Sequence, residues 1–259
     1  MANLNYRAKK RFGQNFLIDH MVIEEILDSI NIDIKDDIVE IGPGLGAITF
    51  PILEQVETLR AIELDKDLIH RFKFSKYVLD KRLSIIEMDA LKVDFNSLFR
   101  EKKLKIVGNL PYNIITPLLF HLFNSLDVID SMYFMVQKEI ADRLVADPGT
   151  KDYGKLGVMA QYFTKTYTVV QVPAECFSPP PKVESAFIKM VPKDNIDFSL
   201  VKTLNTVLTN AFNQRRKKIT NSLSNLISEE DLLSLDIDVT KRPENLSLDE
   251  YIKIASFLK

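Results

Sequence analysis

The sequence has little of several features that mark particular protein classes. Among its 259 residues it has one cysteine and three histidines, and its formal net charge is −2. The single cysteine, Cys176, excludes an internal disulfide framework and any site with several thiolate ligands, and we interpret it as a small core residue in a reducing cytosol. Because His20, His70 and His121 show no ligand spacing, no metal site is predicted.

Long hydrophobic runs are also lacking. The apolar stretch IITPLLFHLF, residues 114–123, is shorter than the ~20 residues that a membrane helix needs, and the basic N-terminus lacks the apolar run of a signal peptide. We therefore expect a cytoplasmic protein with no membrane partner, and a monomer by default. The net charge argues against a protein that coats nucleic acid over its whole surface, but RAKKR at 7–11 and RRKK at 215–218 concentrate positive charge locally.

The first two thirds of the chain alternates strand patterns with helical patterns, which is typical of a parallel sheet covered by helices. Pro51 lies within one helical pattern and predicts a kink or a late start there. The expected strands are 37–42, 58–64, 83–89, 104–109 and 129–137, and the expected helices are 20–30, 47–56, 66–78 and 116–126.

The remainder of the chain is less regular. A helix at 138–146 and a loop at 147–155 precede two strand-like runs, 166–172 and 185–191, which we expect to form an antiparallel edge of the sheet. After Pro192 only helical patterns follow. The prediction is an α/β fold with a Rossmann-like sheet and helices on both faces in residues 1–191, including an N-terminal arm at 1–20. A small all-helical C-terminal domain is predicted at 192–259.

A glycine-rich turn ends the first expected strand in VEIGPGLGAIT, residues 39–49. Glycines there let the backbone approach a ligand closely. Glu63 ends the next strand, 21 residues after Gly42, where a carboxylate can accept both ribose hydroxyls of an adenosine-containing cofactor. The glycines alone fit a nicotinamide dinucleotide, S-adenosylmethionine or a turn that binds nothing. Their spacing departs from G-x-G-x-x-G, and Glu40 favours a cationic ligand over a pyrophosphate.

Polar residues also follow the third and fourth expected strands. Asp89 could accept a hydrogen bond from an adenine amine, or simply cap the next turn. In NLPY, residues 109–112, the side-chain carbonyl of Asn109 and the backbone carbonyl of Leu110 could accept hydrogen bonds from both N–H groups of an exocyclic amine. This would expose the lone pair of the amine nitrogen. Pro111 would fix the turn and Tyr112 would stack on the base, although four such residues also fit a plain Asn-x-Pro turn. We expect these strand ends to converge on one site.

Longer motifs across nearly the whole chain resemble the ribosomal RNA adenine N6-dimethyltransferase family, in its house-keeping bacterial branch. They are KKRFGQNFLID (9–19), VEIGPGLGAIT (39–49), AIELD (61–65), MDALKVD (88–94), GNLPYNI (108–114), MVQKEIADRL (135–144) and FSPPPKVESAF (177–187). The resemblance implies S-adenosylmethionine-dependent dimethylation of two adjacent adenosines near the 3′ end of small-subunit (16S) rRNA, as naked RNA or in a partly assembled particle.

The resemblance also implies roles for individual residues. Asn109, Leu110, Pro111 and Tyr112 would be the catalytic motif, with Phe177 as a second ring against the base, although the sequence alone favours a core position for Phe177. The implied contacts to S-adenosylmethionine are Asn15, Leu17, Gly42, Gly44, Glu63, Asp89 and Asn109. From charge, the RNA surface is expected to include Arg7, Lys9, Lys10, Arg11, Arg215, Arg216, Lys217 and Lys218, although RRKK also fits a solvated helix face.

Three alternatives remain open at this stage. One is the related branch that dimethylates a large-subunit adenine and confers antibiotic resistance. A DNA adenine methyltransferase would be expected to carry a separate base-reading domain, and the sequence shows none. A third is a ribosome-assembly or transcription factor that keeps the fold without catalysis.

Overall fold

The structure is a computed structural model that describes residues 8–9 and 13–259. Contacts divide the chain into two compact units, one comprising Met1–Ala141 and Tyr167–Pro192 and the other Asp142–Thr166 and Lys193–Lys259. Three predicted RNA-binding residues, Arg7, Lys10 and Arg11, lie outside the described residues.

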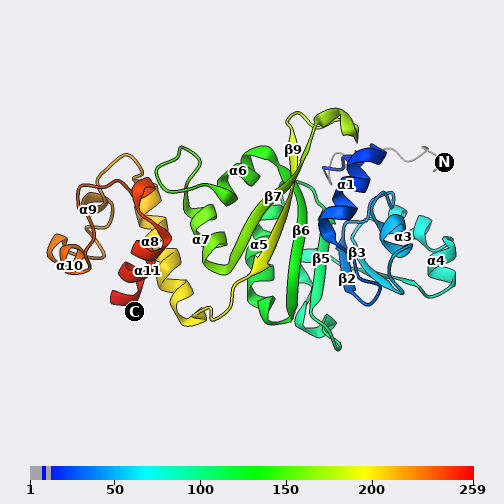
Figure 1. The fold of residues 1–259 in the computed structure, drawn as a ribbon, viewed down its shortest axis with the longest axis horizontal. Helices are drawn as coiled ribbons and strands as arrows, with labels where there is room; N and C mark the ends of the chain where they lie inside the picture. Colours follow the sequence, from blue (N-terminus) through cyan, green and yellow to red (C-terminus); the bar gives the residue numbers. More distant parts are fainter. Residues whose placement is uncertain (1–7, 10–12) are drawn as a thin grey trace. The chain divides into compact units, whose positions relative to one another are not determined.

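A seven-stranded sheet forms the centre of the first unit, in the order β4-β3-β2-β5-β6-β9-β7 (Figure 1). The five strands from β4 to β6 pair in parallel, and β9 pairs antiparallel with β6. The predicted parallel sheet with an antiparallel edge is confirmed. The strands are β2 Asp37–Ile41, β3 Leu59–Glu63, β4 Leu83–Glu87, β5 Leu104–Asn109, β6 Ile129–Gln137, β7 Thr164–Val172 and β9 Ser185–Pro192.

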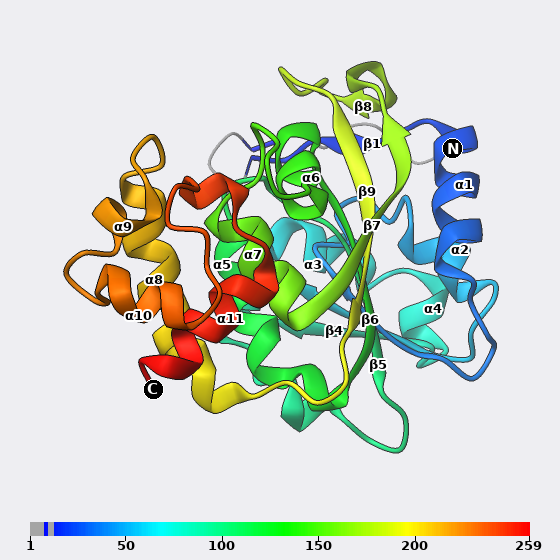
Figure 2. The ribbon, with the colours of Figure 1, turned by 60° about the vertical axis from the view of Figure 1, so that its left-hand side comes forward.

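Helices cover the strands on both sides, as predicted; Figure 2 shows α1 and α4 on one side and α5 on the other. The second helix begins only at Thr49, so Pro51 lies in its first turn, where its missing N–H leaves no helical bond unmade. The helices are α1 His20–Ile30, α2 Thr49–Leu53, α3 Lys66–Phe72, α4 Lys76–Leu79, α5 Ile115–Leu122 and α6 Lys138–Val145, the last of which crosses between the units.

Helix α1 shows how sequence pattern becomes packing. Asp19 caps its first turn, since the side chain accepts a hydrogen bond from the Val22 N–H at 3.0 Å. Ile26 and Ile30, one turn apart, are fully buried in a hydrophobic cluster with sheet residues such as Ile38. Cys176 belongs to the same cluster, so its predicted core position is confirmed.

A second, two-stranded sheet was not expected from the sequence. Strand β1, Phe16–Leu17, pairs antiparallel with β8, Phe177–Ser178, and the Ile18 N–H donates to the Cys176 carbonyl at 2.8 Å. Two-residue strands show no alternation, and their partner lies far along the chain. The pairing fixes the N-terminal arm beside the segment that precedes β9.

The second unit is helical. Its helices are α7 Lys155–Phe163, α8 Val201–Asn213, α9 Ile219–Ser222, α10 Glu229–Ser234 and α11 Leu248–Phe257. No strand lies between Lys193 and Lys259, all of which the structure describes, so the predicted helical C-terminal region is confirmed. Ser247 and Glu250 form a capping box at the start of α11.

Helix α7 was missed because Gly157 interrupts its pattern. A Cβ at Gly157 would lie 2.2 Å from the Arg143 carbonyl oxygen, so the close approach of two backbones requires glycine there. Contacts join residues 142–166 to the helical unit, whereas the sequence placed them in the first domain. The boundary at 191 and 192 stays a prediction. Over residues 8–9 and 13–259, no helix has both the length and the apolar character to cross a membrane.

Candidate functional site

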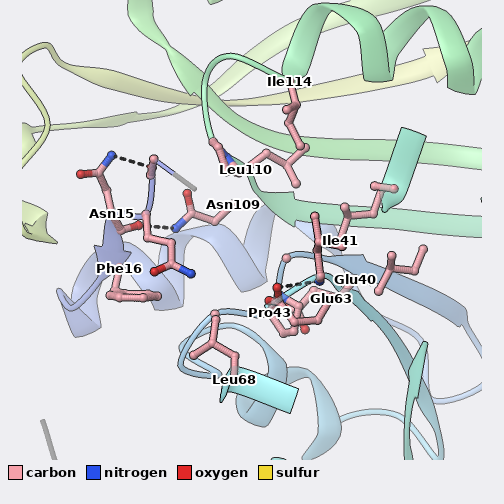
Figure 3. Close-up of a pocket in the computed structure, with 18 of the residues that line it drawn as sticks. Asn15, Phe16, Glu40, Ile41, Pro43, Glu63, Leu68, Asn109, Leu110 and Ile114 are labelled. Carbon is pink, nitrogen blue, oxygen red and sulfur yellow. Dashed lines mark hydrogen bonds between the residues drawn. The ribbon is translucent and has the colours of Figure 1, made fainter. Parts of the chain in front are cut away.

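The ends of neighbouring parallel strands surround one cavity of about 250 Å³ in the first unit. Gly42 after β2, Glu63 at the end of β3, Asp89 after β4 and Asn109 at the end of β5 all line it. Figure 3 labels Glu63 and Asn109 among them. The strand order reverses at β2, which has β3 on one side and β5 on the other, and open α/β sheets bind ligands at such a point. The sequence therefore located the cavity correctly.

The glycine turn brings the arm close to the sheet. Gly42 and Gly44 have φ of +69° and +57°, a region that side chains disfavour. A Cβ at Gly44 would also lie 3.1 Å from the ring of Phe16, which lines the same cavity. A larger residue at Gly44 would displace either the turn or the arm.

Glu63 is held by the backbone that follows it. Its Oε1 accepts hydrogen bonds from the N–H groups of Leu64 and Asp65, at 2.8 and 2.7 Å. The side chain is 8% exposed, and this burial raises the pKa of Glu63, while the N–H groups of Asp65, Leu64 and Gly44 oppose the rise. The carboxyl is thus fixed at the cavity wall, where it can accept ligand hydroxyls.

Glu40 is a buried acid without a complete set of partners. It lines the cavity, is 2% exposed, and its Oε2 has no hydrogen-bond partner among the described residues. Burial raises the pKa of Glu40 to about 8, with a smaller contribution from the Glu63 charge, and the nearby Thr49 side chain opposes the rise. A positive charge entering the cavity would favour the ionised form, so this wall suits a cation better than a phosphate.

Asp89 performs the local task that the sequence left open. Its Oδ1 accepts a hydrogen bond from the Leu91 N–H at 3.0 Å and caps the turn at Ala90–Lys92. The residue also lines the cavity. Capping orients the carboxyl and leaves a second oxygen for a ligand.

The arm positions Asn109. Asn109 Nδ2 donates to the Asn15 carbonyl at 3.3 Å, which directs Oδ1 away from that contact and leaves it to accept (Figure 3). Asn15 and Leu17, the two arm residues expected at the cofactor, both line the cavity. The amide that starts NLPY is therefore oriented by a segment from the other end of the domain sequence.

The rest of NLPY forms a turn whose last residue is tied to β9. The Pro111 carbonyl accepts a hydrogen bond from the Ile114 N–H at 3.1 Å. The hydroxyls of Tyr112 and Ser185 form a hydrogen bond of 2.6 Å. Burial raises the pKa of Tyr112, so its hydroxyl stays protonated at neutral pH. Leu110, Pro111 and Tyr112 all line the cavity.

Phe177 does not lie where the resemblance placed it. It is 2% exposed, belongs to the hydrophobic cluster and pairs with Leu17 through β8 and β1; it is not among the residues that line the cavity. The expected ring against the base is thus part of the core in this structure. Its packing follows from the two-stranded sheet, which the sequence pattern did not reveal.

Lys9 has an intramolecular role that was not predicted. Its Nζ lies 2.6 Å from both Asp65 and Asp67, in the segment just after Glu63. Gln14 adds a hydrogen bond from Nε2 to Asp65 at 3.1 Å and accepts one from the Lys9 N–H at 2.9 Å. These contacts fasten the arm to the end of β3. The acidic run ELDKD, residues 63–67, is the one sequence feature that bears on this pairing.

The basic cluster of the second unit divides into two kinds of residue. Arg215 bonds to Glu244 and to the Lys151 carbonyl, both at 2.5 Å, so it anchors two loops. Arg216, Lys217 and Lys218 are exposed after α8. Within the described residues, no group of three or more His, Cys, Asp or Glu side chains is arranged to hold a metal ion.

The sequence matches a protein family over almost its whole length. The profile of the family described as "Ribosomal RNA adenine dimethylase" matches residues 5–259. Ribosomal RNA small subunit methyltransferase A from Pseudoalteromonas translucida is 51% identical over 260 residues, with 99% of this chain and 97% of the relative covered. The protein of that name from Colwellia psychrerythraea is 48% identical over 259 residues, covering 99% and 86%.

Solved structures share the fold. A dimethyladenosine transferase from Plasmodium falciparum has a TM-score of 0.79 and 25% sequence identity, with 92% of this chain and 95% of that chain covered. The 23S rRNA methyltransferase ErmE has a TM-score of 0.72 and 20% identity, covering 94% and 99%. At that identity the second likeness concerns the fold alone. The Rossmann-like fold with a helical C-terminal region is therefore confirmed.

Proposed function

This chain belongs to the ribosomal RNA adenine dimethylase family, and on that premise we propose that it dimethylates N6 of two adjacent adenosines near the 3′ end of 16S rRNA during small-subunit biogenesis. The methyl donor is S-adenosylmethionine and the product is S-adenosylhomocysteine. The observation that carries the proposal is that Gly42, Glu63, Asp89 and Asn109 line one cavity. The names of the relatives support the small subunit over the large one.

The cavity residues fit the cofactor by chemistry. When bound, S-adenosylmethionine supplies a methyl group on a sulfonium, which is a good leaving group. Glu63 would accept hydrogen bonds from the ribose hydroxyls, Asp89 would accept one from the adenine amine, and the turn at Gly42 and Gly44 would allow close backbone approach. The incomplete partner set of Glu40 supports a cationic ligand nearby.

Methyl transfer itself needs alignment of the target amine. Asn109 Oδ1 and the Leu110 carbonyl oxygen would accept hydrogen bonds from the two N6 hydrogens and leave the nitrogen lone pair exposed toward the methyl group that the bound donor would supply. N6 then releases a proton to solvent. In the second round only one N–H remains, so one of the two acceptors is sufficient.

The target adenosine must leave its stack to reach the cavity. Extrusion costs a few kcal/mol, and stacking on an aromatic ring returns about 1–3 kcal/mol per base. Tyr112 is the ring at the cavity on which the proposal relies. A stacking role for Phe177 would require its ring to leave the hydrophobic cluster.

For RNA binding, the proposal rests mainly on Arg216, Lys217 and Lys218, because Lys9 and Arg215 already have acidic partners. Changing these three residues to Gln should weaken RNA binding. The slope of the logarithm of the binding constant against the logarithm of salt concentration should become shallower by about 0.7–0.9 per lost phosphate contact. The matched control changes three exposed lysines of the first unit, Lys35, Lys81 and Lys103, to Gln. Equal salt slopes in the two triple variants would contradict the assignment.

The function is tested with purified ribosomal subunits. Small and large subunits that lack the modification are incubated with the protein and methyl-labelled S-adenosylmethionine, and rRNA digests are examined by mass spectrometry. We expect N6,N6-dimethyladenosine at two adjacent positions of 16S rRNA. Label in large-subunit RNA would instead favour the resistance-type activity, and binding without methylation would favour an assembly factor.

The setting of the enzyme is part of the same proposal. We propose that it acts in the cytoplasm as a monomer, on 16S rRNA or a partly assembled small subunit, without a metal. Light scattering during size-exclusion chromatography gives the mass directly. A dimer at working concentration would correct the oligomeric state without affecting the reaction.

A further inference from the structure

Ser185 is a buried polar residue at the start of β9. It is fully buried, and the next three residues, Ala186, Phe187 and Ile188, are equally buried and apolar. A hydroxyl in such surroundings costs free energy unless it has a partner. The hydroxyl of Tyr112 is that partner, at 2.6 Å.

This hydrogen bond spans a strand. Tyr112 follows β5, whereas Ser185 begins β9, and β6 lies between them in the sheet. The backbone of β9 is already held by β6, where Ser185 pairs with Gln137. The side-chain bond is therefore not needed to place β9; what it fixes is the tip of the NLPY turn.

The fixed group lies at the cavity, where the proposed function puts the target base. Tyr112 lines the cavity beside Asn109, whereas Ser185 is not among the lining residues. With its hydroxyl held, the ring cannot rotate freely about its side-chain bonds. A ring that is already in place avoids the entropy of ordering it when the base arrives.

We propose that Ser185 is a positioning residue for methyl transfer, whose hydroxyl holds the Tyr112 ring in the orientation that receives the extruded adenine. The inference rests on the proposed function, because it assigns that orientation to catalysis. Ser185 touches neither the base nor the cofactor in this account and acts through Tyr112.

The test compares Ser185→Ala, Tyr112→Phe and the double variant in single-turnover methylation of small subunits. Each single variant removes one hydroxyl and adds no bulk. We expect each to lower the rate about five- to tenfold, and the double variant to be no slower than the singles, because the same contact is lost. The cofactor dissociation constant should stay within about twofold of the wild type.

The matched control is Ser131→Ala, which removes another buried serine hydroxyl from the sheet. Ser131 lies on β6, and its hydroxyl bonds to Asp130 at 2.8 Å. It should retain the wild-type rate. Three results would overturn the inference: an unchanged rate in Ser185→Ala, losses that multiply in the double variant, or an equal loss in Ser131→Ala.

A second readout does not depend on the RNA reaction. In protein labelled with 3-fluorotyrosine, the Tyr112 fluorine resonance is identified by its loss in Tyr112→Phe. It should shift in Ser185→Ala and not in Ser131→Ala, and an unmoved resonance would overturn the inference. A wild-type protein that does not methylate small subunits would refute the proposed function, while this measurement would still test the contact that fixes the ring.

Discussion

On the cofactor side of the cavity, defined as Gly42, Gly44, Glu63 and Asp89, both carboxylates accept hydrogen bonds from backbone N–H groups one or two residues away. Glu63 accepts hydrogen bonds from the N–H groups of Leu64 and Asp65, and Asp89 accepts one from Leu91. The backbone just after each strand therefore orients the carboxylate at the end of that strand. Local geometry is sufficient because the turn begins as soon as the strand stops.

On the base side, defined as Asn109, Leu110, Pro111 and Tyr112, orientation depends on distant segments. Asn109 bonds to Asn15, 94 residues earlier, and Tyr112 bonds to Ser185, 73 residues later. The two sides of one cavity are therefore specified differently. Changes on the cofactor side should alter affinity, whereas changes on the base side should alter rate.

The largest expected effect separates these two outcomes at the base side. Asn109→Ala removes the side-chain acceptor for N6 and should lower the single-turnover methylation rate by about 10²–10³-fold. Cofactor affinity, measured by calorimetry, should fall by less than about fivefold. Asn124→Ala, an exposed asparagine after α5, is the control and should be unaffected. A normal rate in Asn109→Ala would remove the proposed role of the amide.

The converse change lies on the cofactor side. Glu63→Gln keeps the shape of the side chain but loses charge-assisted hydrogen bonds to the ribose, so cofactor affinity should fall about 10–100-fold. At saturating cofactor the methylation rate should stay within a few-fold of the wild type. Glu87→Gln, at the exposed end of β4, serves as the control. A lost rate with normal affinity would reverse the distinction between the two sides.

A third test uses pH to examine how cofactor binding depends on the ionisation of Glu40. Because burial raises the pKa of Glu40 to about 8, we expect binding of a cationic ligand to release the Glu40 proton. Affinity for S-adenosylmethionine should therefore rise with pH between about 6 and 8, by up to about tenfold per unit. Glu40→Gln should flatten that rise, while titration of the ligand's own amine remains in both proteins. Parallel pH profiles would refute the linkage.

The pH dependence of folding stability, measured without the cofactor, tests the raised pKa of Glu40 independently. The unfolded chain ionises Glu40 near the ordinary value of 4.5, whereas the folded chain holds the proton until pH is about 8. Stability from this residue is therefore present at low pH and is lost as pH rises across that window. The melting temperature of Glu40→Gln should fall less over the same range. An equal fall in the two proteins would mean that Glu40 does not titrate as described.

The smallest expected effect concerns the arm that serves both sides. Lys9→Met removes the ion pairs to Asp65 and Asp67 and should speed cofactor release about threefold in stopped-flow measurements, with a smaller difference at high salt. The control is Lys66→Met, since Lys66 is exposed and forms an ion pair with Glu87, which is also exposed. Cofactor release at the wild-type rate would show that the arm stays in place without the ion pairs of Lys9.

The sequence predicted well what lies on single elements. Strand β5 and helix α1 have the predicted boundaries because their burial patterns are complete within the segment. The convergence of Gly42, Glu63, Asp89 and Asn109 followed from the rule that parallel strands end at one edge. Helix α7 was missed because Gly157 serves a backbone contact that a pattern of hydrophobicity does not record.

The sequence by itself determined the parallel sheet with its antiparallel edge, the edge at which the cavity lies and the residue types there, because strand periodicity and turn chemistry are local properties. Only the tertiary structure decided which partner each side chain has. It pairs Lys9 with Asp65, places Phe177 in the core and joins Tyr112 to Ser185 by a hydrogen bond. These contacts join segments that are far apart in the sequence and meet only after folding. The local sequence around a hydroxyl or an ammonium group does not indicate which partner it will have.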